Sequence, residues 1–193
     1  MKIAVKNLSK KFNNIFAVQD ITFDIPKNKT LGLLGPNGCG KTTSIGMMLG
    51  LIEPCEGTIL YDDKDINKTD KNYLLGQMNF ASPYIELPKK LTVKQNLEVY
   101  GRLYGVVNLT QRIFEISSDL NLKSFLEKKT GELSSGQKNR VSLAKSLINK
   151  PKILFLDEPT ASLDPDSGDF VRNYIEDYKS KNNSESLFTD CNK

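Results

Sequence analysis

The sequence of 193 residues lacks several features, and each absence excludes a class of structure or site. It contains no histidine, so no imidazole can act at any site of this chain. Its cysteines are sparse and odd in number (Cys39, Cys55 and Cys191), which argues against a disulfide framework and for a reducing compartment. No apolar run approaches the ~20 residues that cross a bilayer, and residues 1–12 lack the apolar core of a signal peptide. If a membrane is involved, another chain must supply the spanning segments.

The charge pattern does not indicate a nucleic-acid binder. Basic residues outnumber acidic ones by only 27 to 23, and they occur in short pairs such as Lys10-Lys11 and Lys89-Lys90. A nucleic-acid-binding protein usually shows a denser basic stripe. Short lysine pairs are typical of a solvated protein surface, so we expect no nucleic-acid partner. The length and the hydrophobic share of 38% suit one globular domain with a buried core.

Segments with strand character predict a mixed α/β domain. Residues 3–5, 21–25 and 30–34 are short runs rich in isoleucine, leucine and phenylalanine. Residues 152–156 (KILFL) are apolar behind a single charge. Such a run is typical of a strand covered on both faces of a parallel sheet.

Helical patterns lie between these strands. Thr92 and Gln95 fit a capping box, and apolar residues then recur at helical spacing as far as Tyr104. Further helices are predicted at 135–149 and from Pro165 onward. Because the middle of the chain looks mainly helical, we expect an α/β core at about 1–82 and 150–193, with a helical subdomain inserted at about 83–149.

A glycine-rich segment follows the strand at 30–34 and precedes a predicted helix at 42–49. It fits G-x-x-x-x-G-K-[ST] with one further threonine, in the residues Gly35, Pro36, Asn37, Gly38, Cys39, Gly40, Lys41, Thr42 and Thr43. Glycines let backbone N–H groups approach phosphate oxygens, and the helix start adds positive potential. Lys41 can reach the β- and γ-phosphates, and the Thr42 hydroxyl can bind Mg²⁺. A glycine-rich turn before an ordinary helix is the alternative, but the placement between strand and helix favours a phosphate loop.

Two carboxylates, Asp157 and Glu158, end the apolar strand. Ligands of open α/β sheets bind at the carboxyl ends of the strands, so both acids should face the phosphate loop. Asp157 is then a holder of Mg²⁺, and Glu158 is placed to polarise a water that attacks the γ-phosphate. A solvated acidic pair at a strand end is the alternative, which the phosphate loop upstream disfavours.

Three further motifs resemble those of ABC (ATP-binding cassette) ATPases. The family's LSGGQ signature is matched, with serine in place of the first glycine, by Leu133, Ser134, Ser135, Gly136 and Gln137. Ser134 with Gln137 also fits a capping box, which would explain this segment by itself. The family's D-loop is matched by Ser162, Leu163 and Asp164. Phe12 resembles the aromatic residue that stacks on adenine.

The resemblance implies a P-loop NTPase core with a mostly parallel sheet, helices on both faces, antiparallel strands near the amino terminus and an inserted helical subdomain. It implies that two such ATPase subunits, identical or different, pair head to tail, with ATP and Mg²⁺ on the phosphate loop of one and the signature of the other over the γ-phosphate. The helical insert is the usual docking face for a transmembrane permease, which would hold this cytoplasmic subunit at the inner face of the membrane. Segments 91–93, 96–97 and 103–105 look like those of exporter ATPases.

The chain departs from the family at two places. The Q-loop glutamine should follow a strand expected at 74–78, where alignment gives Phe80, and Gln77 and Asn79 are the other candidates. The histidine that contacts the γ-phosphate should follow a last strand, but Asp190 stands there after residues 186–189. A carboxylate repels a γ-phosphate, so we expect intact ATP binding with impaired turnover. A truncated or frameshifted product, a naturally short variant, and a missing part supplied by another chain all remain open.

Two other functions are compatible with these motifs. One is an ABC-type ATPase that acts on the ribosome or on nucleic acid without a membrane partner, and the other is a degenerate remnant. The interval between Lys41 and Leu133 is too short for a long inserted coiled coil, and only one cassette is present. Both facts favour the ATPase subunit of a transporter.

Overall fold

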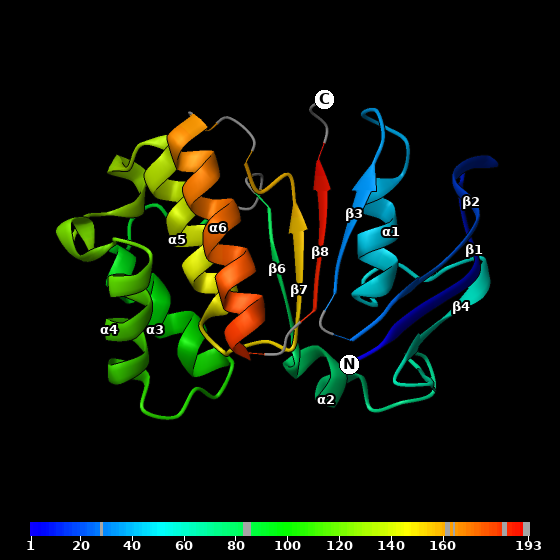
Figure 1. Cartoon of the computed structure of the whole chain (residues 1–193), viewed down its shortest axis with the longest axis horizontal. Helices are drawn as coiled ribbons and strands as arrows, with labels where there is room; N and C mark the ends of the chain where they lie inside the picture. Colours follow the sequence, from blue (N-terminus) through cyan, green and yellow to red (C-terminus); the bar gives the residue numbers. More distant parts are fainter. Residues whose placement is uncertain (28, 83–85, 161–162, 164, 183–184, 191–193) are drawn as a thin grey trace.

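The computed structural model describes residues 1–27, 29–82, 86–160, 163, 165–182 and 185–190 (Figure 1). Its strands are β1 (Ile3–Phe12), β2 (Ile15–Ile25), β3 (Thr30–Leu34), β4 (Glu56–Tyr61), β5 (Lys64–Asp65), β6 (Met78–Ala81), β7 (Ile153–Asp157) and β8 (Glu185–Asp190). Its α-helices are α1 (Lys41–Met48), α2 (Lys71–Gly76), α3 (Val93–Leu103), α4 (Leu109–Asp119), α5 (Ser135–Leu147) and α6 (Pro165–Asn182). The predicted α/β class is confirmed.

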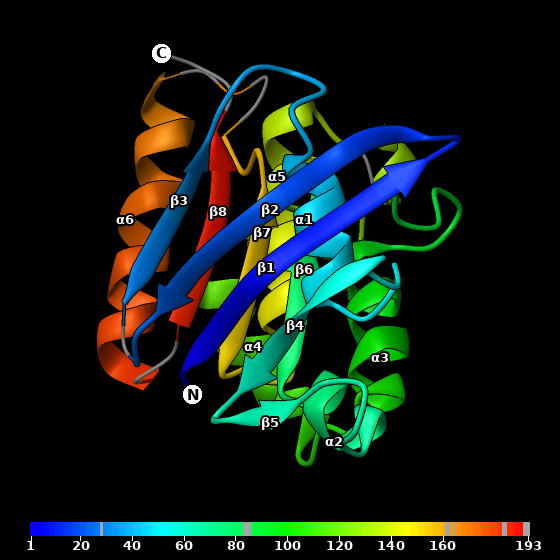
Figure 2. The same cartoon turned by 90° about the vertical axis from the view of Figure 1, so that its right-hand side faces the viewer.

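The strands form two sheets that face each other across α1. One is antiparallel, in the order β2-β1-β4-β5, and the other is parallel, in the order β3-β8-β7-β6. Figure 1 shows α1 between the two sheets and α5 and α6 on the opposite face of the parallel sheet, with α3 and α4 outside them. Figure 2 shows β1 and β2 crossing in front of α1.

Strand β7 divides the core into two halves. Its five residues are all buried, as its apolar sequence predicts. Because side chains alternate along a strand, Ile153 and Phe155 pack with α1 and the antiparallel sheet, and Leu154 and Leu156 pack with α3, α4, α5 and α6. Asp157 has the same parity as Ile153 and Phe155, so it lies on the α1 side.

Both predicted capping boxes are present, and they set the starts of α3 and α5. The Thr92 hydroxyl accepts from the backbone N–H of Gln95, whose side chain accepts from the backbone N–H of Thr92. Ser134 and Gln137 exchange the same two bonds. Each box satisfies two backbone donors that a helix start otherwise leaves unpaired. Helix α6 begins at Pro165, as predicted.

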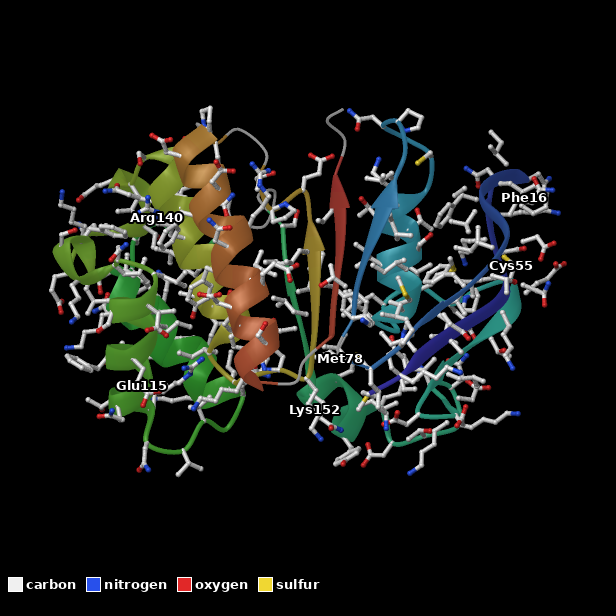
Figure 3. The ribbon with its side chains drawn as sticks, viewed as in Figure 1. Phe16, Cys55, Met78, Glu115, Arg140 and Lys152 are labelled. Atoms are coloured by element: carbon white, nitrogen blue, oxygen red, sulfur yellow. The ribbon has the colours of Figure 1, made fainter. Side chains whose placement is uncertain are left out.

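The prediction of a strand at 74–78 is wrong. The Asp70 side chain accepts from the backbone N–H groups of Asn72 and Tyr73 and so starts α2, which continues to Gly76. The strand of this region is β6, which begins at Met78 and pairs with Ile153 of β7. Figure 3 shows Met78 and Lys152 at the end of the parallel sheet where β6 and β7 begin.

Among the described residues, we find no helix with the length and apolarity needed to span a membrane. The division into an α/β core and a helical insert at 83–149 stays a prediction.

Candidate nucleotide-binding site

The carboxyl ends of the four parallel strands meet at one edge of the sheet. The phosphate loop leaves β3, Asp157 ends β7, Ser82 follows β6, and the backbone of Asp190 pairs with Leu34 at the end of β3. Polar residues at this edge of an open α/β sheet are well placed to bind a ligand. The candidate site is built here.

The phosphate loop ends in a helix start that has no side-chain cap. The residue at the cap of α1 is Gly40, whose φ of 94° lies in the left-handed region. A Cβ at this position would overlap the backbone oxygen of Ala17 in β2, so only glycine fits. Backbone N–H groups at the start of a helix are suited to bind phosphate oxygens.

The Lys41 ammonium is held over the loop by backbone carbonyls. Its Nζ donates to Gly35 O at 2.6 Å and to Pro36 O at 2.9 Å. These two bonds direct the charge toward the space that the loop encloses, where it can neutralise phosphate oxygens. The exposed thiol of Cys39 lies 4.0 Å from the same nitrogen.

Thr42 and Asp157 meet across the sheet edge. The Thr42 hydroxyl, in the first turn of α1, donates to Asp157 Oδ2 at 3.1 Å, although the two residues are 115 positions apart. Asp157 is only 4% exposed, on the face of β7 that packs against α1. Mg²⁺ usually takes one or two protein oxygens and completes its octahedron with waters and substrate phosphates. A hydroxyl and a carboxylate beside a phosphate loop fit that requirement, and no cluster of three acidic, cysteine or histidine ligands occurs in the part of the chain that the structure describes.

Glu158 follows directly with an unusual backbone. Its φ of 49° is left-handed, although proline follows and favours an extended residue before it. The carbonyl of Pro159 accepts a bond from Asn139 Nδ2 at 2.9 Å, so α5 supports this turn. Sequence reasoning did not single out Asn139, because no local pattern marks a bond between residues 20 positions apart.

Phe12 lies at the end of β1, at the tip of the β1–β2 hairpin, and is 49% exposed. The Lys10 ammonium lies 5.3 Å from its ring centroid. The same hairpin continues to Ala17, whose backbone touches the phosphate loop at Gly40. An exposed ring near the loop is consistent with stacking on a base, the role that the resemblance implies for Phe12.

The signature residues are not part of the same site. Leu133 is buried in the helical half of the core, whereas Ser134 and Ser135 are exposed at the start of α5. Helices α1 and α5 cover opposite faces of the parallel sheet (Figure 1). The phosphate loop and the signature of one chain therefore lie on different sides of the sheet.

None of the Q-loop candidates occupies the expected place. Asn79 is buried at the amino-terminal part of β6, where it donates to Asn149 Oδ1 and accepts from the Tyr104 hydroxyl. Phe80 lies within β6, and Gln77 caps α2, far from the carboxyl edge. None of the three candidates follows the strand, because the strand begins four residues later than expected. The residue that follows β6 is the buried Ser82, which sequence reasoning missed for the same reason.

The structure describes some of the remaining motif residues and not others. Leu163 of the D-loop packs against the helical half of the core, and its backbone N–H donates to Thr160 O. Ser162 and Asp164 lie outside the described residues. Residues 186–189 belong to β8, as predicted, and Thr189 pairs with Asp157.

Comparisons with known proteins agree with this geometry. The family model described as "ABC transporter" matches residues 18–161. The chain is 38% identical over 165 residues to the probable multidrug ABC transporter ATP-binding protein YbhF of Escherichia coli, and the match covers 84% of this chain and 28% of that protein. It is 32% identical over 183 residues to the ABC transporter ATP-binding protein NatA of Bacillus subtilis, covering 92% and 74%. The chain thus spans only about a quarter of YbhF.

A solved structure extends the match to three dimensions. The protein cbiO1 from Clostridium perfringens, described as part of an ABC transporter complex, superposes with a TM-score of 0.86 at 25% identity. The superposition covers 98% of this chain and 78% of that one. The region that the family model matches contains the phosphate loop, the signature and the acidic pair.

Proposed function

The chain belongs to the ABC transporter ATP-binding family, and from this premise we propose that it binds and hydrolyses Mg²⁺-ATP to drive transport by a membrane partner. The observation that carries the proposal is the 3.1 Å bond between the Thr42 hydroxyl and Asp157 beneath an intact phosphate loop. This pair joins the phosphate loop to the strand-end carboxylate, the two elements that hold Mg²⁺ in a P-loop ATPase, across 115 residues.

The site residues have distinct roles in this proposal. Backbone N–H groups of the loop 35–43 and the Lys41 ammonium bind the phosphates. Thr42 and Asp157 hold Mg²⁺, which neutralises charge on the phosphate oxygens. Glu158 accepts a hydrogen bond from the attacking water and orients it toward the γ-phosphorus. Phe12 stacks on the adenine ring.

A second ATPase subunit is part of the proposal. The signature of one copy lies on the other side of the sheet from its own phosphate loop (Figure 1), so the two motifs suit different nucleotides. In a head-to-tail pair, the exposed Ser134 and the start of α5 would approach the γ-phosphate held by the partner's loop. ATP binding would then close the pair, and hydrolysis would release it.

A transmembrane permease is the proposed membrane partner. The helical region leaves large apolar side chains exposed, including Leu103 at 73% and Val107 at 81%, together with Val99 and Phe114. Exposed apolar side chains gathered on neighbouring elements favour a protein interface. Docking there would hold the subunit on the inner face of the membrane. The exporter-like segments 91–93, 96–97 and 103–105 favour export.

Low turnover is the remaining part of the proposal. The backbone of Asp190 pairs with Leu34, directly before the phosphate loop. A carboxylate at this position, where the family has histidine, would repel the γ-phosphate. We expect Asp190→His to raise the ATPase rate without changing the affinity for Mg²⁺-ATP, and an unchanged rate would contradict this part alone.

Calorimetric titration with Mg²⁺-ATP tests the proposed function. The wild-type chain should bind the nucleotide, and Lys41→Ala should weaken binding strongly. Lys89→Ala, which removes an exposed lysine paired with Glu86 on the surface, is the matched control and should bind as the wild type does. A wild-type chain that does not bind Mg²⁺-ATP would overturn the proposal.

A further inference from the structure

Asn139 joins the signature helix to the catalytic loop of the same chain. It lies in α5, two residues after the signature, and its Nδ2 donates to Pro159 O at 2.9 Å. Pro159 is the residue directly after Glu158. Asn139 and Pro159 line one small cavity with Ser82, Leu156 and Val171, so the bond is partly shielded from water.

The turn at Glu158 needs support of this kind. A left-handed φ is unfavourable for a residue with a side chain, and a following proline disfavours helical backbone further. Such a conformation persists only where the surroundings hold it. The bond from Asn139 to Pro159 O is one contact that holds the chain directly after Glu158.

The other end of α5 is fixed independently. The Arg112 guanidinium, from α4, donates to Leu147 O at 2.6 Å and to Ile148 O at 3.1 Å. Figure 3 shows Arg140, of α5, above Glu115, of α4, on the helical side of the molecule. A tilt of α5 about its fixed carboxyl end would move its amino-terminal part most, and this part carries both the signature and Asn139.

We propose that Asn139 is a positioning residue that holds Glu158 in its left-handed conformation and couples it to the signature helix. The inference rests on the proposed function. When the signature of one copy engages the ATP of a second copy, the shift of α5 passes through Asn139 and Pro159 to the Glu158 of its own site. The nucleotide bound at each site thereby affects the alignment of the Glu158 carboxylate at the other site.

The test compares three variants in single-turnover and steady-state ATPase assays. Asn139→Ala should lower kcat by roughly tenfold to a hundredfold, because a displaced catalytic group costs about that much, whereas KM and the affinity for Mg²⁺-ATP stay within about twofold. Asn139→Gln keeps an amide donor and should recover most of the rate. Asn149→Ala removes a bond of the same type, from Nδ2 to Gly76 O at 3.2 Å, together with the bond that Asn149 Oδ1 accepts from Asn79. Asn149 lies beyond the far end of α5, and this variant should leave kcat unchanged.

The possible results separate a failure of this inference from a failure of the proposed function. A normal kcat in Asn139→Ala, beside a wild type that binds and hydrolyses ATP, overturns this inference alone. An equal fall of kcat in Asn139→Ala and Asn149→Ala shows a general loss of packing and also overturns it. A wild type without ATP hydrolysis overturns the proposed function and this inference together.

Discussion

Replacing Arg112 by methionine tests the junction at which α4 supports the carboxyl end of α5. Methionine keeps an unbranched apolar chain and removes the guanidinium. Arg112 is only 9% exposed and donates to the last carbonyl groups of α5, at Leu147 and Ile148. The variant leaves both carbonyls without this donor and removes a positive charge from the negative end of the helix dipole.

The magnitude follows from these contacts. A hydrogen bond from a charged group contributes about 1.5–3 kcal/mol, so two give about 3–6 kcal/mol. Water can reach this region through the surface cavity that Arg112 lines with Lys150 and Tyr174, and hydration of the freed carbonyls lowers the expected loss to about 2–4 kcal/mol. The contact with Glu115, at 3.5 Å, adds little because that carboxylate is substantially exposed.

Urea denaturation measures this loss as a fall of the midpoint at unchanged slope. The matched control is Lys150→Met, which removes an exposed ammonium 3.9 Å from the same Glu115 and should cost less than about 1 kcal/mol. Affinity for Mg²⁺-ATP should not change in either variant, because the phosphate loop lies on the other face of the sheet. Equal midpoints for the two variants would refute the assigned role of Arg112.

Three further perturbations test the site and the core. Thr42→Val should weaken nucleotide binding in the presence of Mg²⁺ but not in its absence, since it removes only the hydroxyl that faces Asp157; equal losses under both conditions in a titration would contradict the Mg²⁺ assignment. Gly40→Ala should abolish ATP binding and lower the urea midpoint, because the new Cβ overlaps Ala17 O and φ is left-handed. Wild-type binding and an unchanged midpoint in this variant would contradict the prediction. Burial lowers the pKa of Lys145 below its ordinary value of 10.5, so the unfolded chain holds this proton more tightly. Wild-type stability relative to Lys145→Met should therefore rise as pH increases from the lowered pKa to 10.5, and a difference that is independent of pH would argue against it.

Much of the site was predictable because its signals are local. The phosphate loop is set by glycine and lysine spacing within eight residues, and both capping boxes by residues three apart. The apolar run before Asp157 predicted a strand buried on both faces, and β7 is one. The rule that ligands meet the carboxyl ends of strands then placed Asp157 beside Thr42, as their bond confirms.

Other features depend on contacts between distant segments, and only the tertiary structure decided them. Pairing with β7 set the register of β6, which displaced the Q-loop candidates and turned Asn79 toward Asn149. The sequence by itself determined which residues can bind phosphate, because that chemistry needs only a short backbone motif. The packed sheet decided which face each motif occupies. It also placed Asn139 against Pro159, the residue after Glu158, and this contact exists only after folding.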